Sequence, residues 1–341
     1  MELGGKCKSL RTLFIQATRI TEKGIISALN NLPHLKILDH PHVFRALAEM
    51  HRNQQQPLPK YGLNNLWFAM KHCQLLDRVG PCRGDDLGLA ASACPLVTKV
   101  VLCFAERDNI ITDRELLGLL AFEKLNELTL MWETNDNNSR FTFNGSLATV
   151  LKARGMSLQY LKMYVNSIEV DVDFLLEFCP NLKYLELGCR FTSRDEPHNP
   201  KRTKRETRVF EQLETLRIQS EDSENLIGLL SAAPALTHLV FRNCLNLTDD
   251  VLQKVFEFHS FTSLKELEFY MLHSLTDQGI DLFMNERNAL EKIKLEYCDT
   301  VTPAKVRGWR NNAEKNNWNL TIDVSMFITL RPTLRPLRRI N

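Results

Sequence analysis

Few residues of this sequence have the types and the spacing that chemistry at a site requires. His72, Cys73 and Cys82 lie close together in the chain, as do His40 and His42. Imidazole and thiolate groups are the usual zinc ligands. These spacings match no zinc-binding pattern, however, so we expect no metal site.

A glycine-rich stretch, residues 80–88 (GPCRGDDLG), comes nearest to a phosphate-binding loop. It lacks the lysine that such a loop places against a phosphate. We interpret it as a tight loop in which Asp85 or Asp86 caps the following helix. No dinucleotide-binding motif and no Ser/His/Asp or Cys/His arrangement in a recognisable context is present. We therefore expect no catalytic residue and no cofactor, and predict that the chain is not an enzyme.

The composition is that of a globular protein without a strong overall charge. Apolar residues make up 44% of the 341 residues and charged residues 25%, and the formal net charge is +2. These values exclude a chain that is disordered throughout and a nucleic-acid polycation, so we expect no specific nucleic-acid partner. Basic residues are nevertheless concentrated in two segments, 190–208 and 326–341.

Two sequence features bear on the cellular compartment. The first thirty residues contain no apolar signal-peptide core, and no apolar run approaches the ~20 residues that span a bilayer. The nine cysteines are scattered and form no C-x-x-C pair. This usage is typical of reduced, mostly buried cysteines, so we expect a cytoplasmic or nuclear protein, or both, without a membrane partner.

An internal repeat organises almost the whole chain. The pattern L-x-x-L-x-L, with any apolar residue at its fixed positions, recurs about every 28 residues, within the ~20–29-residue period of leucine-rich repeats. Its eleven copies begin at Leu10, Leu35, Leu63, Val97, Leu125, Leu158, Leu182, Leu213, Leu236, Leu264 and Leu290. The copy at Leu35 is degenerate, with His40 at its last apolar position.

The repeat also predicts which elements it forms. L-x-L alternation predicts a short strand with one buried face, and apolar runs of helical period lie between the strands. Thr112, Thr248 and Thr276 each precede an aspartate and predict helix N-caps, and Thr302 precedes Pro303. We therefore predict an α/β leucine-rich-repeat solenoid, a horseshoe with parallel strands on its concave face and helices on its convex face. It has about eleven repeats in residues 1–325 and a last strand at residues 318–322.

Three stretches interrupt the period, and we expect loops near residues 51–60, 133–140 and 190–208. The third contains the basic residues Lys201, Arg202, Lys204 and Arg205. They are compatible with nuclear localisation or an anionic partner, but we favour a solvated loop. We expect the Pro- and Arg-containing tail, residues 326–341, to be disordered.

The alternation also predicts which side chains point to the concave face. Tyrosine, methionine and arginine are enriched in protein interfaces, and concave faces are the extended binding surfaces of solenoids. We therefore predict a protein target on this face, bound chiefly by Met131, Tyr160, Tyr164, Tyr184, Arg217, His238, Arg242 and Tyr270. The same rule places further residues beside them: Thr129, Lys162, Glu186, Gln219, Glu268, Lys294 and Glu296.

Several motifs resemble one subclass of leucine-rich repeats. ITEKGI from Ile20, LTDDVL from Leu247 and LTDQGI from Leu275 resemble the I-T-D-x-G-L signature of cysteine-containing repeats, and Cys244 and Cys298 occupy its cysteine position. The chain is in this respect similar to F-box/LRR proteins. The resemblance implies substrate recognition for an SCF-type ubiquitin ligase.

The same family carries an F-box before its repeats, whereas here the first repeat is under way by Cys7. We thus expect Skp1 and a cullin as partners only if an F-box is supplied outside this chain. Two alternatives stay open: a stand-alone scaffold or inhibitor-like binding module, and a GTPase regulator. Neither of them involves ubiquitin.

Overall fold

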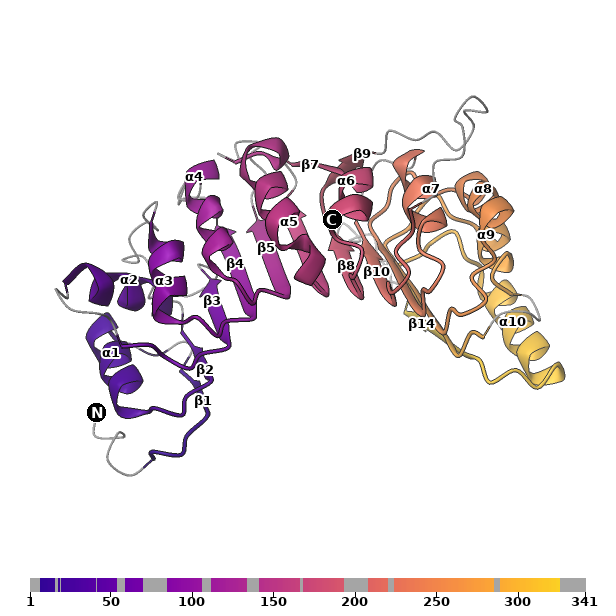
Figure 1. The fold of residues 1–341 in the computed structure, drawn as a ribbon. Helices are drawn as coiled ribbons and strands as arrows, with labels where there is room; N and C mark the ends of the chain where they lie inside the picture. Colours follow the sequence, from indigo (N-terminus) through magenta and orange to yellow (C-terminus); the bar gives the residue numbers. More distant parts are fainter. Residues whose placement is uncertain are drawn as a thin grey trace, which may run out of the picture.

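The chain forms an arch with its strands on the inner side and its helices on the outer side (Figure 1). The computed structural model describes residues 7–15, 18, 20–40, 42–53, 59–69, 85–105, 112–133, 141–165, 168–192, 208–219, 224–284 and 289–325. Basic residues 201, 202, 204 and 205, the tail 326–341 and residues 72, 73 and 82 lie outside these ranges.

One parallel sheet runs through the described part of the chain, and its strands follow one another in sequence order. Its twelve strands are β1 (Thr12–Phe14), β2 (Ile37–Asp39), β3 (Asn65–Ala69), β4 (Lys99–Ala105), β5 (Glu127–Glu133), β6 (Tyr160–Val165), β8 (Tyr184–Leu187), β10 (Thr215–Ile218), β11 (His238–Arg242), β12 (Glu266–Tyr270), β13 (Lys292–Glu296) and β14 (Thr321–Ser325). This is the topology of a leucine-rich-repeat solenoid, and it confirms the predicted fold class.

Each of the predicted anchors is followed by a strand that begins two residues later, as Leu125 is by β5. The alternation explains the strands. Leu128 and Leu130 of β5 are buried against the helices, while Met131, which follows Leu130, is partly exposed on the other face. Because side chains alternate along a strand, the leucines of stacked repeats form one continuous core.

Helices cover the convex side of this sheet (Figure 1). They are α1 (Glu22–Asn31), α2 (Val43–Asn53), α3 (Asp86–Ala93), α4 (Asp113–Leu116), α5 (Ala148–Arg154), α6 (Val172–Phe178), α7 (Glu224–Ser231), α8 (Asp249–Phe258), α9 (Asp277–Asp281) and α10 (Pro303–Lys315). Single turns of other helix types lie at Leu117–Ala121, Phe143–Leu147 and Gly155–Ser157. In α8, Leu252 and Val255 face the core, as the helical period predicts.

The predicted threonine N-caps are confirmed. The Thr248 hydroxyl accepts from the Val251 backbone N–H, and the Thr302 hydroxyl accepts from that of Lys305. Thr112 and Thr276 cap α4 and α9 in the same way, and Thr112 forms a capping box with Glu115. Each cap satisfies a helix-terminal donor that would otherwise be unpaired.

The aspartates that follow Thr248 and Thr276 accept hydrogen bonds from the next repeat. The Asp249 carboxylate accepts hydrogen bonds from the backbone N–H groups of Thr276 (2.9 Å) and Gly279 (3.0 Å) and from the Thr276 hydroxyl (2.5 Å). Asp277 accepts from the backbone N–H of Thr302 at 3.3 Å. A negative charge is favourable at the positive end of a helix. Thr-Asp thus caps two consecutive helices and ties neighbouring repeats together.

The predicted loop boundaries need correction at three points. Residues 51–53 are the last residues of α2, where Arg52 reaches Asp85 at 2.9 Å. Glu133 is the last residue of β5. Residues 190–192 form β9 (Arg190–Thr192), which pairs with β7 (Glu169–Asp171) in a second, two-stranded sheet. Val170 and Phe191 are buried, and burial of these apolar side chains against the core stabilises the two short strands.

Two local predictions are also wrong in part. The last strand is β14, Thr321–Ser325, rather than residues 318–322. The backbone N–H of Trp318 donates to the Ala313 carbonyl at the end of α10 and is therefore not part of a strand. Asp85 stands at the N-cap of α3, but neither it nor Asp86 is shown capping the helix with its side chain. Both carboxylates instead bind the Arg52 guanidinium. A cross-repeat ion pair therefore replaces the predicted cap.

Candidate functional site on the concave face

The concave side chains form three parallel rows, because neighbouring strands pair in register. The first row runs through Lys99, Glu127, Tyr160, Tyr184, Thr215, His238, Glu266, Lys292 and Thr321. The second row runs through Val101, Thr129, Lys162, Glu186, Arg217, Val240, Glu268, Lys294 and Asp323. The third row holds Cys103, Met131 and Tyr164 on one side and Arg242, Tyr270, Glu296 and Ser325 on the other.

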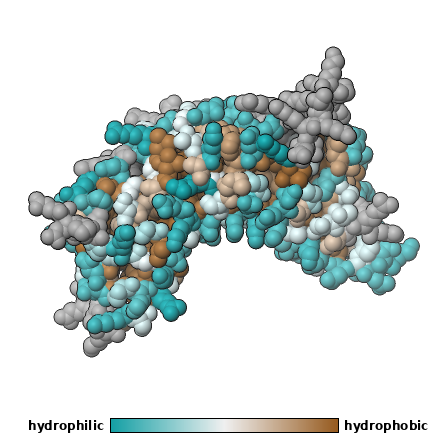
Figure 2. Space-filling model, in the orientation of Figure 1, coloured by the Kyte–Doolittle hydropathy of each residue, from teal (hydrophilic) through white to brown (hydrophobic). Residues whose placement is uncertain are grey.

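The rows lie on the inner side of the arch, which is open toward solvent. Figure 2 shows the molecule hollowed on its lower side, with hydrophilic residues along much of the lower margin. Adjacent strands are ~4.8 Å apart, so residues in one row are close enough to contact one another.

An aromatic pair stands at the centre of the first row. The rings of Tyr160 and Tyr184 stack at 4.2 Å between centroids and 9° between planes. The Lys99 ammonium lies 5.6 Å from the centre of the Tyr160 ring and pairs with Glu127 at 2.7 Å. The stack offers a rigid, amphipathic surface, which is what interface hot spots favour.

Glu186 is the polar centre of the second row. Its carboxylate is buried, pairs with the Lys162 ammonium at 3.0 Å and accepts a hydrogen bond from the Tyr184 hydroxyl. Burial, then the hydrogen bond and charge of Glu186, raise the pKa of Tyr184 well above its usual range. Tyr184 therefore stays a neutral donor at physiological pH, and the charge of Glu186 is balanced within the face.

A second cluster surrounds Tyr270. The Arg242 guanidinium and the Lys294 ammonium each lie 5.0 Å from the centre of its ring. The Tyr270 hydroxyl donates to Glu268 and accepts from Lys294 at 3.1 Å. Hydrogen bonds to Glu296 and Tyr270 raise the pKa of Lys294, which is held as a cation.

All of the predicted concave residues lie on this face, but the structure brings them together in two groups. The first group is the stack of Tyr160 and Tyr184, whereas Met131 and Tyr164 are partners of each other across β5 and β6 in the third row. The second group consists of Arg242 and Tyr270. Between the groups lie Arg217, and His238 with its Nε2 3.5 Å from Glu266. That these residues bind a protein stays a prediction.

The prediction omitted Lys99 and Glu127, which support the stack from one end. The alternation rule that placed Tyr160 would have placed both, since each stands two residues after an anchor.

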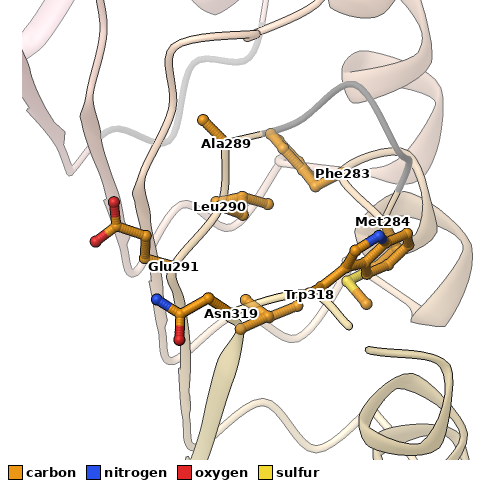
Figure 3. A pocket seen from close by; sticks show the side chains of 8 residues that line it. Phe283, Met284, Ala289, Leu290, Glu291, Trp318 and Asn319 are labelled. Carbon is orange, nitrogen blue, oxygen red and sulfur yellow. The ribbon is translucent and has the colours of Figure 1, made fainter. Parts of the chain in front are cut away.

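A separate pocket of about 300 Å³ lies toward the C-terminal end of the described residues (Figure 3). It is lined by Phe283, Met284, Ala289, Leu290, Glu291, Trp318, Asn319 and Leu320. Figure 3 shows the polar ends of Glu291 and Asn319 on the side away from Phe283, Met284 and Trp318. The pocket is mostly apolar, and no residue of the three rows lines it.

Two kinds of feature are missing from the described part of the chain, namely metal-binding clusters and membrane-spanning helices. No group of three or more His, Cys, Asp or Glu side chains in these ranges has the proximity that a metal ion requires. Within the same ranges, no helix combines the length and apolar character needed to cross a membrane.

No known protein family model matches this chain, and no curated protein matches it. Among solved structures, it is similar to a chain in the crystal structure of the Rad7 and Elc1 complex in yeast. The sequence identity is 16% and the TM-score 0.43, with 92% of this chain and 87% of that chain covered. A likeness this remote says nothing about function, and the fold rests on the strand order described above.

Proposed function

We propose that this chain is a non-catalytic protein-binding module that holds a protein target on its concave face. The observation that supports this best is the stack of Tyr160 on Tyr184, set between the ion pairs Lys99–Glu127 and Lys162–Glu186. Ordered aromatic rings lose little conformational entropy on binding, and the ion pairs around them give a partner polar groups to match.

Within this function, we propose the role of substrate recognition in an SCF-type ubiquitin ligase. The cysteine-containing repeats support it. Cys244 and Cys298 are buried, and their thiols donate to the carbonyls of Ile218 (3.4 Å) and Phe269 (3.7 Å) of the preceding strands. Such an adaptor has no reacting groups of its own and contributes proximity between the target and the ligase. Skp1 and a cullin would join only through an F-box outside this chain.

Affinity capture of the tagged endogenous protein tests both levels of the proposal. The concave variant replaces Met131 and Tyr160 by serine. Both side chains are partly exposed, and neither takes part in an ion pair among the described residues. A matched variant replaces Gln253 and Lys254 by serine, both exposed on convex helix α8. We expect one protein to be recovered with the wild-type and convex variants and lost with the concave variant.

Equal recovery with both variants would contradict binding through the concave face. Recovery of Skp1 and a cullin with the wild-type protein would support the adaptor role. One abundant partner without ligase subunits would favour the alternative, a stand-alone scaffold or inhibitor-like module.

A further inference from the structure

Two arginines on neighbouring strands border a shallow hollow in the middle of the concave face. Arg217 comes from β10 and Arg242 from β11, and Tyr164, Glu186 and Gln219 line the hollow with them. Its volume is about 10 Å³, about enough for one water molecule. The hollow is therefore a contact point for a small polar group rather than a pocket for a ligand.

The cations around the hollow differ in how they are balanced. Lys162 pairs with Glu186 at 3.0 Å, and Lys294 pairs with Glu296 at 2.5 Å. Within the described residues, Arg217 and Arg242 have no carboxylate at ion-pair distance. Glu186, which faces Arg217 across the strand pair, is itself paired with Lys162, so neither guanidinium has an ion-pair partner among the described residues.

The environment of each guanidinium prepares it for an anion. The Arg217 Nε atom is buried and has no hydrogen-bond partner in the described part of the chain, and an unpaired buried donor carries a desolvation cost. Arg242 is exposed and stacks on the Tyr270 ring, which leaves its N–H edge for a partner. A guanidinium presents paired N–H groups that match the two oxygens of a carboxylate.

We propose that Arg217 and Arg242 bind an acidic side chain, aspartate or glutamate, of the protein target. This inference rests on the proposed function and names the chemistry that the concave face recognises. A carboxylate fits better than a phosphate group, because Glu186 lines the same hollow and repels a dianion more strongly than a monoanion. The small volume of the hollow also favours the smaller group.

The neighbouring side chains predict what accompanies the acid. A Cβ atom on Gly188 would come within 2.4 Å of the Tyr164 ring, so the ring packs directly against the glycine backbone. Tyr164 is two strands from Arg217, a distance of ~10 Å across the sheet. An extended peptide covers this distance in about three residues. The target segment therefore crosses the strands with an apolar residue about three positions from the acidic one.

Selection from a display library of random 12-residue peptides tests the proposal. The full chain is compared with the double variant Arg217→Gln/Arg242→Gln. A control, Lys254→Gln/Arg307→Gln, removes the same charge from exposed positions on the convex helices α8 and α10. We expect acidic residues, with an apolar residue about three positions away, to be enriched by the wild-type and control proteins and not by the arginine variant.

Fluorescence anisotropy with the selected peptide, its Glu→Gln form and its phosphoserine form then assigns the contact. We expect the Glu peptide to bind the arginine variant about tenfold or more weakly, and the Gln peptide to lose no further affinity with that variant. Arg217→Lys keeps the charge without the paired donors and should lose part of the affinity. Because Arg242 is exposed, Arg242→Gln alone provides the test if substitutions at Arg217 prevent folding.

Four results would overturn the inference. Selected peptides without acidic enrichment, or equal binding of the Glu peptide by wild-type and arginine variants, would contradict it while leaving concave binding intact. Tighter binding of the phosphoserine form would contradict the assignment to a carboxylate. Retention of no peptide by the wild-type protein would contradict both this inference and the proposed function.

Discussion

At the scale of single residues, the Thr-Asp pairs have two separable tasks. Thr248 caps α8 itself, while Asp249 satisfies donors of the next helix, α9. The second task crosses a repeat boundary, so it adds a charged contact between two units that also share apolar contacts, strand pairing and the hydrogen bond from the Ser274 hydroxyl to the Leu245 carbonyl.

Replacement of Asp249 by alanine is expected to destabilise the protein by about 1–3 kcal/mol, because two backbone N–H groups of the next helix lose a charged acceptor. Asp250→Ala is the matched control, since Asp250 occupies the same helical turn and is exposed. Urea unfolding of both variants measures the difference. Equal losses of stability would show that the acidic first turn matters only through its charge.

The Thr-Asp pair also shows what a sequence can predict. A threonine before an apolar helical run is a local signal, and it located the caps at Thr112, Thr248, Thr276 and Thr302 correctly. The partner of Asp249 lies 27 residues away, and only the stacking of repeats brings it near. The same holds for Lys162 and Glu186, whose ion pair depends on strand register.

At the scale of elements, each of the eleven anchors lies two residues before one of the strands β1 to β6, β8 and β10 to β13, because the repeat imposes one geometry on each unit. The sheet of β7 and β9 could not be predicted in this way. Its strands are three residues long and lie outside the repeated motif. Buried Val170 and Phe191 resemble any apolar pair in a connecting segment until they are placed opposite each other.

Helix α10 is the longest described helix, and it contains a glycine that its fold does not require. A Cβ atom on Gly308 would meet no other atom within 4 Å, and the residue is exposed. Gly308→Ala is therefore expected to stabilise the protein by about 0.5–1 kcal/mol, through the lower backbone entropy of the unfolded chain.

Gly155→Ala provides the comparison for this prediction. A Cβ atom there would collide with the Phe178 carbonyl oxygen and with Cys179, so we expect a loss of stability. Thermal unfolding of both variants shows whether each substitution raises or lowers the stability of the protein. A destabilised Gly308→Ala protein would mean that the α10 backbone has requirements beyond those of an ordinary helix.

At the scale of the whole molecule, the sheet is not equally strong along its length. β4 and β5 pair over seven residues, whereas β2 and β3 pair at the single position Ile37–Asn65, and β1 and β2 are three residues long. Since each repeat contacts only its neighbours, local opening is easiest where the pairing is shortest.

Hydrogen exchange is expected to reflect this gradient. Backbone amides of β1 and β2 should exchange at least about tenfold faster than those of β5 and β6, because their opening requires less than global unfolding. Exchange followed by mass spectrometry with peptide resolution measures both regions in one sample. Uniform protection from β1 to β6 would show that the arch opens only as a single cooperative unit.

The strictly sequential strand order has a consequence for synthesis of the chain. Each strand of the large sheet pairs with a strand from an adjoining repeat, so none of these described strands waits for a partner at the far end of the polypeptide. A ribosome that releases about one repeat at a time therefore supplies each new strand directly to the edge on which it docks. The arch can grow as it is translated, in the order in which its message is read.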